Sequence, residues 1–325
     1  MTPPKSDRDR HAARPLARPL PRRQVLAGLA GAASFAATSG AHAQFDLNIG
    51  GINLGGIFSA VQSLFEGFSL GEEDEIKIGV RLYPRMIADF GGAYKNSAVQ
   101  SAMKQFAEPL IGTTRRSNLP WEIVVLDDDT VNAWALPGGK LAVNKGLLRY
   151  TATATELAAV IGHEIGHVEK AHALSEMKTG KFTDFVGKAG AEAIRGNLLS
   201  GGSSVMMNDM VLDLLSSAIT RMVTTGYSRA AELEADTHLL EVFDMAGYDP
   251  KHAGDFYRTL LQLIPEDAEG STSLFSTHPE TEERADRLDE LAEDRPQPKF
   301  PAASRGFAEL KAVFPTRKYF RRTNT

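Results

Sequence analysis

The chain has 325 residues, of which 42% are hydrophobic, and a formal net charge of −5. This length supplies enough apolar residues to bury the core of one large domain or two small ones. The absence of cysteine from the sequence excludes disulfides, thiolate metal sites and cysteine nucleophiles, and the acidic balance argues against a general nucleic-acid-binding protein.

The first part of the chain differs in charge from the rest. Residues 1–43 carry seven basic and two acidic residues, a net charge of +5, so residues 44–325 carry a net charge of −10. Such a break is typical of a leader that precedes a separate mature protein.

This basic segment has the order of features that export signals share. Arg22 and Arg23 precede an apolar run that is shorter than the roughly 20 residues of a membrane span, and an Ala-His-Ala cleavage signal ends at Ala43. We predict a leader at 1–43 that uses the twin-arginine export machinery and is cleaved near Ala43. A general secretory signal is the alternative, and both place the mature chain in the bacterial periplasm.

The next segment, 44–70, is rich in glycine and apolar residues. It lacks Lys and Arg, so packing onto the protein is favoured over peripheral contact with a membrane surface. Four acidic residues from Glu72 onward suit a helix N-terminus, and we expect Pro84 to kink or end that helix.

The hydrophobic period then changes to that of strands. Residues 121–128 and 131–136 are β-type runs, and Pro137-Gly138-Gly139 forms a turn into 140–146. From there to about residue 292 the sequence is mostly helical. We therefore predict an α+β fold, mostly helical with a small antiparallel β-sheet.

Two segments interrupt or follow the predicted helices. Residues 196–210 are rich in Gly, Ser and Met, which indicates a mobile loop that gates a cleft. Residues 293–325 contain several prolines and a basic end, and we predict a loosely packed C-terminal tail there.

A His-Glu-Ile-Gly-His sequence carries the chemistry. It lies on a predicted helix in which Thr153 and Glu156 have the spacing of a capping box. His163 and His167 project from the same side of this helix, one turn apart, so they can share one metal ion beside Glu164. Zinc in such a site lowers the pKa of its water towards ~7, and a nearby Glu can take the proton. This pattern predicts a hydrolase with one Zn²⁺ per chain.

A third ligand must come from another segment. Glu232 and Asp236 are four residues apart on a predicted helix, so Glu232 can reach the metal while Asp236 supports a ligand or the substrate. Spacing alone does not separate this role from that of a solvated carboxylate. Glu234 points away from that line and is expected to be solvated, and His172 lies nearly opposite His163, which argues against a ligand role.

Several segments together resemble one known family. The His-Glu-Ile-Gly-His helix, Glu232 with Asp236, and the sequence from Asn132 to Gly139 resemble HtpX/Oma/Ste-type gluzincin metallopeptidases, which include periplasmic BepA-like proteases. The resemblance runs in order from about residue 72 to 292. It implies a zincin-type metallopeptidase domain at 71–292.

The resemblance also implies site residues. It implies zinc ligands at His163, His167 and Glu232, with Glu164 as general base. It further implies roles near the active site for three more residues: Asp236, which we expect to orient a zinc-ligating histidine, His278, which stabilises the oxyanion or caps the zinc, and Arg284. In the family an edge strand pairs with an extended substrate, which here corresponds to Asn132, Ala133, Trp134 and Ala135. Ordinary sheet core is the alternative for those four.

We therefore predict a zinc endopeptidase that cleaves unfolded or misassembled periplasmic and envelope proteins in protein quality control. The sequence shows neither the spanning helices of integral-membrane relatives nor the repeat domain of BepA-like ones. One alternative is a metal-binding chaperone or adaptor whose zinc site is closed by His278. Another is a small-molecule metallohydrolase.

Overall fold

The computed structural model describes residues 48–49, 52–53, 71–177, 217, 219–261, 274–278, 281–300 and 302–316. All of them belong to one compact unit, Asp46–Thr325. The predicted leader at 1–43 and the predicted gating loop at 196–210 lie outside these ranges. So does most of 44–70, where β1 (Asn48–Ile49) and β2 (Ile52–Asn53) form an antiparallel ladder.

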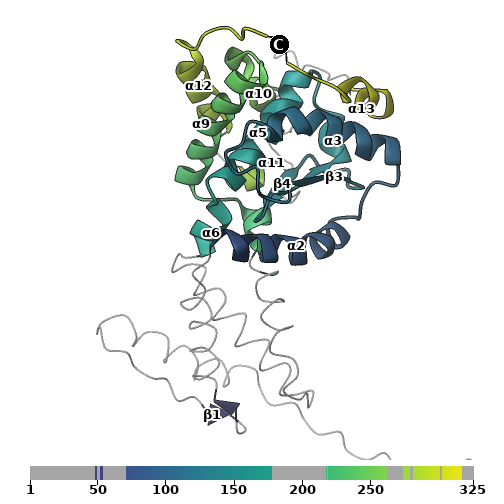
Figure 1. The fold of residues 1–325 in the computed structure, drawn as a ribbon, viewed down its shortest axis with the longest axis vertical. Helices are drawn as coiled ribbons and strands as arrows, with labels where there is room; N and C mark the ends of the chain where they lie inside the picture. The colour runs from purple at the N-terminus through teal and green to yellow at the C-terminus, as the bar shows by residue number, and fades with distance from the viewer. Residues whose placement is uncertain are drawn as a thin grey trace, which may run out of the picture. The chain divides into compact units, whose positions relative to one another are not determined.

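Helices dominate the remaining elements (Figure 1). In chain order they are α2 (Glu72–Asp89), α3 (Ser97–Ile111), β3 (Glu122–Leu126), β4 (Ala133–Leu136), β5 (Lys140–Asn144), α4 (Lys145–Leu148), α5 (Ala154–Glu169), α6 (His172–Met177), α9 (Arg229–Ala246), η2 (Pro250–His252), α10 (Asp255–Leu261), α11 (Leu274–Thr277), α12 (Thr281–Ala292) and α13 (Phe307–Val313). The predicted α+β class is confirmed. Within the described ranges, no helix is both long and apolar enough to cross a membrane.

The sheet has three strands in the order β3-β5-β4. The turn through Gly138 and Gly139, at φ +73° and +78°, joins β4 to β5 as an antiparallel pair. The pair β3–β5 is parallel, so the prediction of an antiparallel sheet is wrong for this pair. Strand β5 lies between β3 and β4. Strand β4 therefore runs in the opposite direction to both of the other strands.

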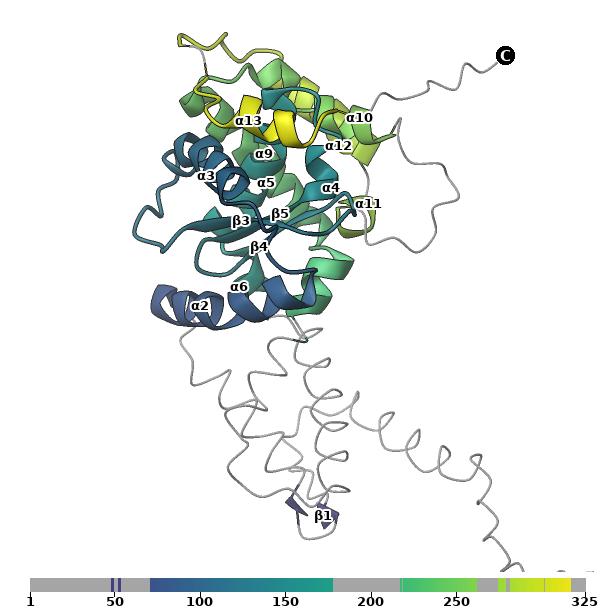
Figure 2. The same cartoon turned by 90° about the vertical axis from the view of Figure 1, so that its right-hand side faces the viewer.

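The two faces of the sheet pack against different helices (Figures 1 and 2). Ala133 and Ala135 of β4 join the larger core cluster, which includes residues of α3 and α5. Trp134 and Leu136 join the smaller cluster, which includes residues of α2. This alternation is the period of two that a strand imposes on its side chains. Strand β4 is therefore an edge strand that is covered on both faces.

Helix α5 is the central helix, and it begins as the sequence predicts. Thr153 and Glu156 form a complete capping box. A Cβ atom added at Gly162 would come within 2.7 Å of a Leu239 side-chain atom, and one at Gly166 within 2.9 Å of a backbone oxygen of α9. These two glycines, one turn apart, let α5 and α9 approach closely. That approach brings the histidines of one helix next to the carboxylates of the other.

Two predictions about other helices need correction. Of the two outcomes predicted for Pro84, a kink or the end of its helix, the second is wrong because α2 continues to Asp89. The predicted loose tail is wrong for residues 302–316, where α13 packs on α3 and buries Leu310 and Phe314 almost completely. These two apolar residues are four apart and share one helix face, which gives α13 a surface to bury.

Candidate metal centre

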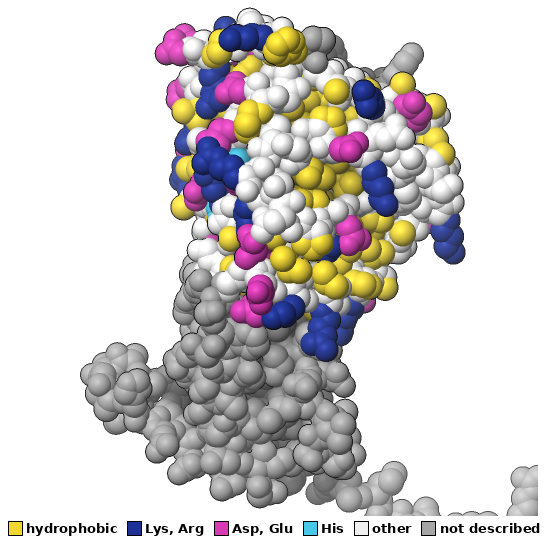
Figure 3. Space-filling model, viewed as in Figure 1, with side chains coloured by type: hydrophobic (Ala, Val, Ile, Leu, Met, Phe, Trp, Pro, Cys, Tyr) yellow, Lys and Arg dark blue, Asp and Glu magenta, His cyan; other side chains and the backbone are white. Residues whose placement is uncertain are grey.

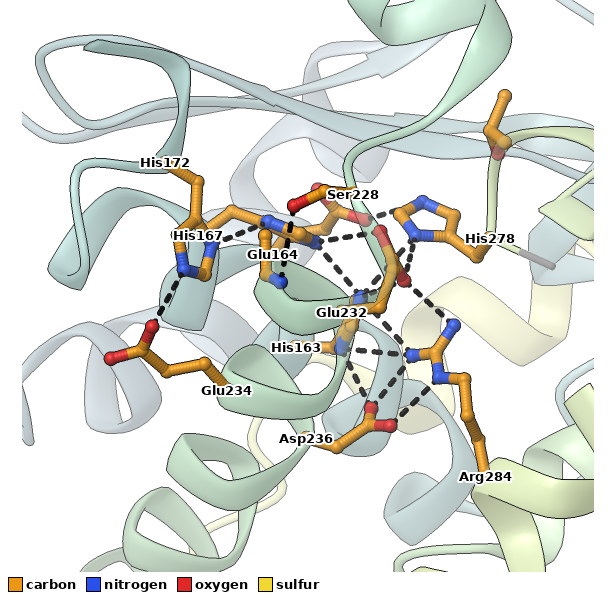
Figure 4. A network of polar contacts seen from close by, with 12 residues as sticks. His163, Glu164, His167, His172, Ser228, Glu232, Glu234, Asp236, His278 and Arg284 are labelled. Carbon is orange, nitrogen blue, oxygen red and sulfur yellow. Dashed lines mark hydrogen bonds and ion pairs between the residues drawn. The ribbon is translucent and has the colours of Figure 1, made fainter. Parts of the chain in front are cut away.

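Four side chains converge on one point in the interior (Figure 4). His163 and His167 come from α5, Glu232 from α9, and His278 from the residue that follows α11. Each offers one nitrogen or oxygen atom, and these four atoms lie within 4.8 Å of one another. All four residues are at most 5% exposed.

The spacing of these atoms indicates a place for a cation. The Nε2 atom of His163 lies 3.0 Å from Nε2 of His167 and 3.3 Å from Nδ1 of His278. A carboxylate oxygen of Glu232 lies 3.3 Å from Nε2 of His163 and 2.9 Å from Nδ1 of His278. Lone pairs that face each other at these distances repel unless protons or a cation lie between them. The structure thus brings the three predicted ligands together and adds His278 as a fourth group.

Glu164 lies beside this cluster. It is 2% exposed, and its Oε1 atom, which lies 3.4 Å from Nε2 of His278, has no hydrogen-bond partner among the described residues. Burial raises the pKa of Glu164. A buried carboxylate with a raised pKa is a stronger base than an exposed one, so it accepts a proton more readily.

On one side of the cluster, Asp236 contacts His163. Its Oδ1 atom lies 3.0 Å from Nδ1 of His163 and accepts a hydrogen bond of 2.7 Å from Nη2 of Arg284, while its Oδ2 atom accepts one of 2.7 Å from Nε of Arg284. Arg284 also lies 2.7 Å from Glu232 through Nη1. Tyr257 of α10 donates its hydroxyl proton to Asp236 and accepts from Arg284. The sequence gives no signal for Tyr257, because only the packing of α10 against α12 brings it here.

On the other side, His172 contacts His167. The two Nδ1 atoms are 2.9 Å apart, and Nε2 of His172 lies 3.4 Å from Oε2 of Glu234. The expected position of His172, opposite His163 on one continuous helix, is wrong because α5 ends at Glu169 and the chain turns before α6. Glu234 is exposed, as the sequence predicts, with 55% of its side chain accessible, and it also contacts His172.

Ionic contacts stabilise the charged form of both buried carboxylates of α9. Burial alone raises the pKa of a carboxyl group, but His278 and hydrogen bonds from His163 and His167 hold the pKa of Glu232 well below its ordinary value. In the same way Arg284 and His163 outweigh burial and hold the pKa of Asp236 below its usual range. Both groups are therefore ionised at neutral pH.

The two histidines of α5 differ in their electrostatic surroundings. Burial and Arg284 lower the pKa of His163, but the hydrogen bonds to Asp236 and Glu232 outweigh them and raise it to about 9. Burial lowers the pKa of His167 well below its ordinary value in spite of its contact with Glu232. His167 is thus neutral, the form in which imidazole binds a metal ion.

A small cavity connects the cluster to edge strand β4. It is lined by Ala133, Trp134, Ala135, Glu164, Met222, Val223, Gly226, Tyr227, Thr277 and His278. Of the four residues predicted to bind substrate, only Asn132 is absent from this lining. The Asn132 side chain instead accepts hydrogen bonds from the backbone N–H of Ala133 and from the Thr277 hydroxyl. The Trp134 ring packs against Tyr83 and Phe90 in the smaller core cluster.

The outer surface contrasts with this interior. On the face shown in Figure 3, acidic and basic side chains are interspersed, and histidine contributes hardly any of the visible surface. This agrees with the burial of the histidines in the cluster.

Comparisons with known proteins place this arrangement in context. The profile of Peptidase family M48 matches residues 94–292. The chain is 31% identical over 191 residues to mitochondrial metalloendopeptidase OMA1 of Arabidopsis thaliana, a match that covers 58% of this chain and 35% of that protein. It is 27% identical over 241 residues to metalloprotease YcaL of Escherichia coli, which covers 74% and 89% of the two chains.

A third similarity is to the beta-barrel assembly-enhancing protease of Escherichia coli, at 24% identity over 234 residues. That match covers 71% of this chain and 46% of the relative. The chain thus spans about a third of OMA1 and about half of the assembly-enhancing protease, but most of YcaL.

Proposed function

Because this chain belongs to Peptidase family M48, a family of metalloproteases, we propose that it is a zinc-dependent endopeptidase of unfolded or misassembled envelope proteins. One observation carries the proposal. The two histidines of the His-Glu-Ile-Gly-His helix meet Glu232 in the interior, with Glu164 beside them.

The donor atoms fit zinc. A tetrahedral zinc ion with metal–nitrogen distances of about 2.0–2.1 Å holds two nitrogens roughly 3.3 Å apart. Nε2 of His163 lies 3.0 Å from Nε2 of His167 and 3.3 Å from Nδ1 of His278. Imidazole and carboxylate ligands without thiolate suit a catalytic zinc site. In this proposal His163, His167 and Glu232 hold one zinc ion per chain.

Zinc, when bound, supplies a Lewis acid and lowers the pKa of its water to about 7. The remaining steps belong to side chains of the protein. Glu164 accepts the proton of the attacking water on its carboxylate and then transfers it to the nitrogen of the departing amine. Its burial beside the ligands places it for both transfers, and its raised pKa favours the first of them, acceptance of the proton from water.

His278 and Arg284 complete the proposed catalytic group. The Nε2 atom of His278 faces Glu164, from where an N–H can donate to the oxyanion of the attacked carbonyl. Its Nδ1 atom is also close enough to cap the metal in a resting state. Arg284 and Asp236 act through Glu232 and His163 by holding these ligands in place.

Edge strand β4 offers a place for an extended polypeptide. We propose that a substrate segment pairs with the backbone of Ala133–Ala135, with Asn132 at the start of the strand. The cavity between β4 and Glu164 would receive the scissile bond. One relative is named for enhancing beta-barrel assembly, which supports misassembled proteins as the substrate class here.

The proposed location is the bacterial periplasm, reached through a leader at 1–43 that the twin-arginine machinery exports. The sequence features at Arg22, Arg23 and Ala43 support this part of the proposal. Export that persists unchanged after Arg22→Lys with Arg23→Lys would refute the twin-arginine route.

A casein assay tests the peptidase. Zinc-loaded protein should cleave casein, lose activity on treatment with a chelator, and regain it when zinc is restored. Glu164→Gln should lose at least about 100-fold in rate because the proton transfer is removed, while zinc binding persists. Glu169→Gln, on the same helix but outside the cluster, is the control and should retain activity. If zinc-loaded protein binds casein without cutting it, the chaperone alternative replaces the peptidase.

A further inference from the structure

We propose that His172 and Glu234 form a relay that positions His167: His167 donates its Nδ1 proton to His172, and His172 donates its Nε2 proton to Glu234. The inference rests on the proposed function in that it takes His167 as a metal ligand. It assigns roles to two residues outside the four-residue metal cluster.

The orientation of the His167 ring supports the first step of the relay. Its Nε2 atom faces the ligand cluster, 3.0 Å from Nε2 of His163 and 3.5 Å from Oε1 of Glu232. Its Nδ1 atom faces the opposite way and lies 2.9 Å from Nδ1 of His172. A neutral imidazole has one N–H, and a nitrogen that binds a metal uses its lone pair. The proton of His167 therefore sits on Nδ1 and is donated to His172.

The second step follows from the first. When Nδ1 of His172 accepts a hydrogen bond, the N–H of a neutral ring lies on Nε2. That atom lies 3.4 Å from a carboxylate oxygen of Glu234. One choice of proton positions thus satisfies both contacts. In Figure 4 His172 and Glu234 lie together on one side of the cluster, away from Asp236 and Arg284.

The backbone conformation just before His172 supports its contact with His167. Ala171 has φ +51°, and within the described part of the chain it is the single non-glycine residue with positive φ. This conformation is unfavourable for alanine, so the surrounding structure must hold it. The turn it makes separates α5 from α6 and returns the chain so that His172, only 4% exposed, faces His167.

A second contact fixes the plane of the same ring. Tyr227 stacks on His167 with ring centroids 4.2 Å apart and an interplanar angle of 19°. Stacking restricts the tilt of the ring but leaves it free to slide and to rotate within its plane. The hydrogen bond from Nδ1 to His172 removes that freedom and aims Nε2 at the metal position. Outer groups of this kind typically contribute 10–100-fold to metal affinity.

The chain contains a matched control on α9, the helix that also carries Glu234. His238 of α9 is 3% exposed, and its Nδ1 lies 3.2 Å from Oε2 of the partly exposed Glu241. This pair resembles His172 and Glu234 in burial and contact. No metal-cluster residue contacts it in the described part of the chain. Substitutions there report the general cost of disturbing a buried histidine–glutamate pair.

The experiment measures zinc affinity of the full chain by competition with a chromophoric chelator, together with the visible spectrum of the Co²⁺-substituted protein. His172→Phe keeps a ring but removes the acceptor, so we expect the zinc Kd to rise by about 10–100-fold and the Co²⁺ bands to shift. His172→Asn retains an acceptor near the Nδ1 position and should restore most of the affinity. His238→Phe and Glu241→Gln should leave both readouts unchanged.

Three results would overturn the relay. They are a wild-type Kd and Co²⁺ spectrum in folded His172→Phe, an equal change in His238→Phe, and a wild-type chain that binds no zinc. If His172→Phe does not fold, Glu234→Ala at the partly exposed end of the relay decides, with a smaller rise in Kd expected and no change refuting the proposal. Zinc binding without casein cleavage in the wild type would refute the peptidase alone.

Discussion

The two histidines of α5 have the same residue type, helix and burial, yet the groups behind them differ (Figure 4). Behind His163 lies Asp236, a buried carboxylate in contact with Arg284. Behind His167 lies His172, followed by the half-exposed carboxylate of Glu234. We call the first set the ionic support and the second the imidazole support. The motif has a histidine at each end, but the groups behind these two histidines differ in charge.

The difference shows how a buried donor can be oriented in two ways. A buried carboxylate is a strong acceptor, but its charge needs a buried partner, which Arg284 supplies at 1% exposure. A neutral imidazole needs no counter-charge. Its second nitrogen donates to a carboxylate near the surface, which water already solvates. The ionic support should therefore matter for folding as well as for the metal, whereas the imidazole support should matter chiefly for the metal.

The largest expected effect is on stability and comes from the ionic support. Arg284→Met leaves Asp236 and Glu232 buried without their cation, so the free energy of unfolding should fall by about 3–5 kcal/mol. Chemical denaturation of the metal-free protein measures this loss. Arg287→Met, three residues on in α12, removes only hydrogen bonds to Leu233 and Thr237 and should cost about 1 kcal/mol. Equal losses in the two variants would remove the distinction between the supports.

The next effect is on the metal. Asp236→Asn keeps the size of the side chain but replaces the charged acceptor behind His163, and it weakens the contact with Arg284. We expect the zinc Kd to rise by about 100-fold, the upper end of the range for outer groups. Chelator competition measures it beside His172→Phe. A smaller rise than in His172→Phe would mean that the imidazole support is the stronger one.

Features set by neighbouring residues were predictable from the sequence. Two of these depend on spacing within one helix: the capping box of Thr153 and Glu156, and the shared face of His163 and His167. The structure has both. The edge position of β4 came from the family resemblance, and the structure places this strand at the edge of the sheet.

Features set by contacts between distant parts of the chain were not predictable from the sequence. The parallel pairing of β3 with β5 depends on the path of the chain between strands, and period-two patterns carry no direction. Tyr257 joins the ionic support only because α10 packs beside α12. The expected position of His172 assumes one continuous helix, but α5 ends at Glu169, and alanine at 171 gives no sign of a left-handed turn.

Tyr257→Phe tests how far the ionic support depends on neutral groups. The change removes one hydroxyl that donates to Asp236 and accepts from Arg284, and it leaves the ring in place. The free energy of unfolding should fall by about 1–2 kcal/mol, because the Arg–carboxylate contact remains. Thermal or chemical denaturation reports this loss. A loss as large as that of Arg284→Met would show that the hydroxyl, and not the ion pair, holds Asp236.

The smallest effect is expected at the turn that serves the imidazole support. Ala171→Gly relieves a left-handed conformation that costs alanine roughly 1–2 kcal/mol, but glycine loses about 0.4–1 kcal/mol through greater freedom in the unfolded chain. The net change should be a stabilisation of up to about 1.5 kcal/mol, with the zinc Kd unchanged, since the packing around His172 still determines its position. Denaturation and chelator competition on the same preparation measure both quantities. A stabilised protein that binds zinc more weakly would mean that the strain itself presses His172 onto His167. In that case backbone strain would maintain the imidazole support, whereas electrostatic attraction maintains the ionic support.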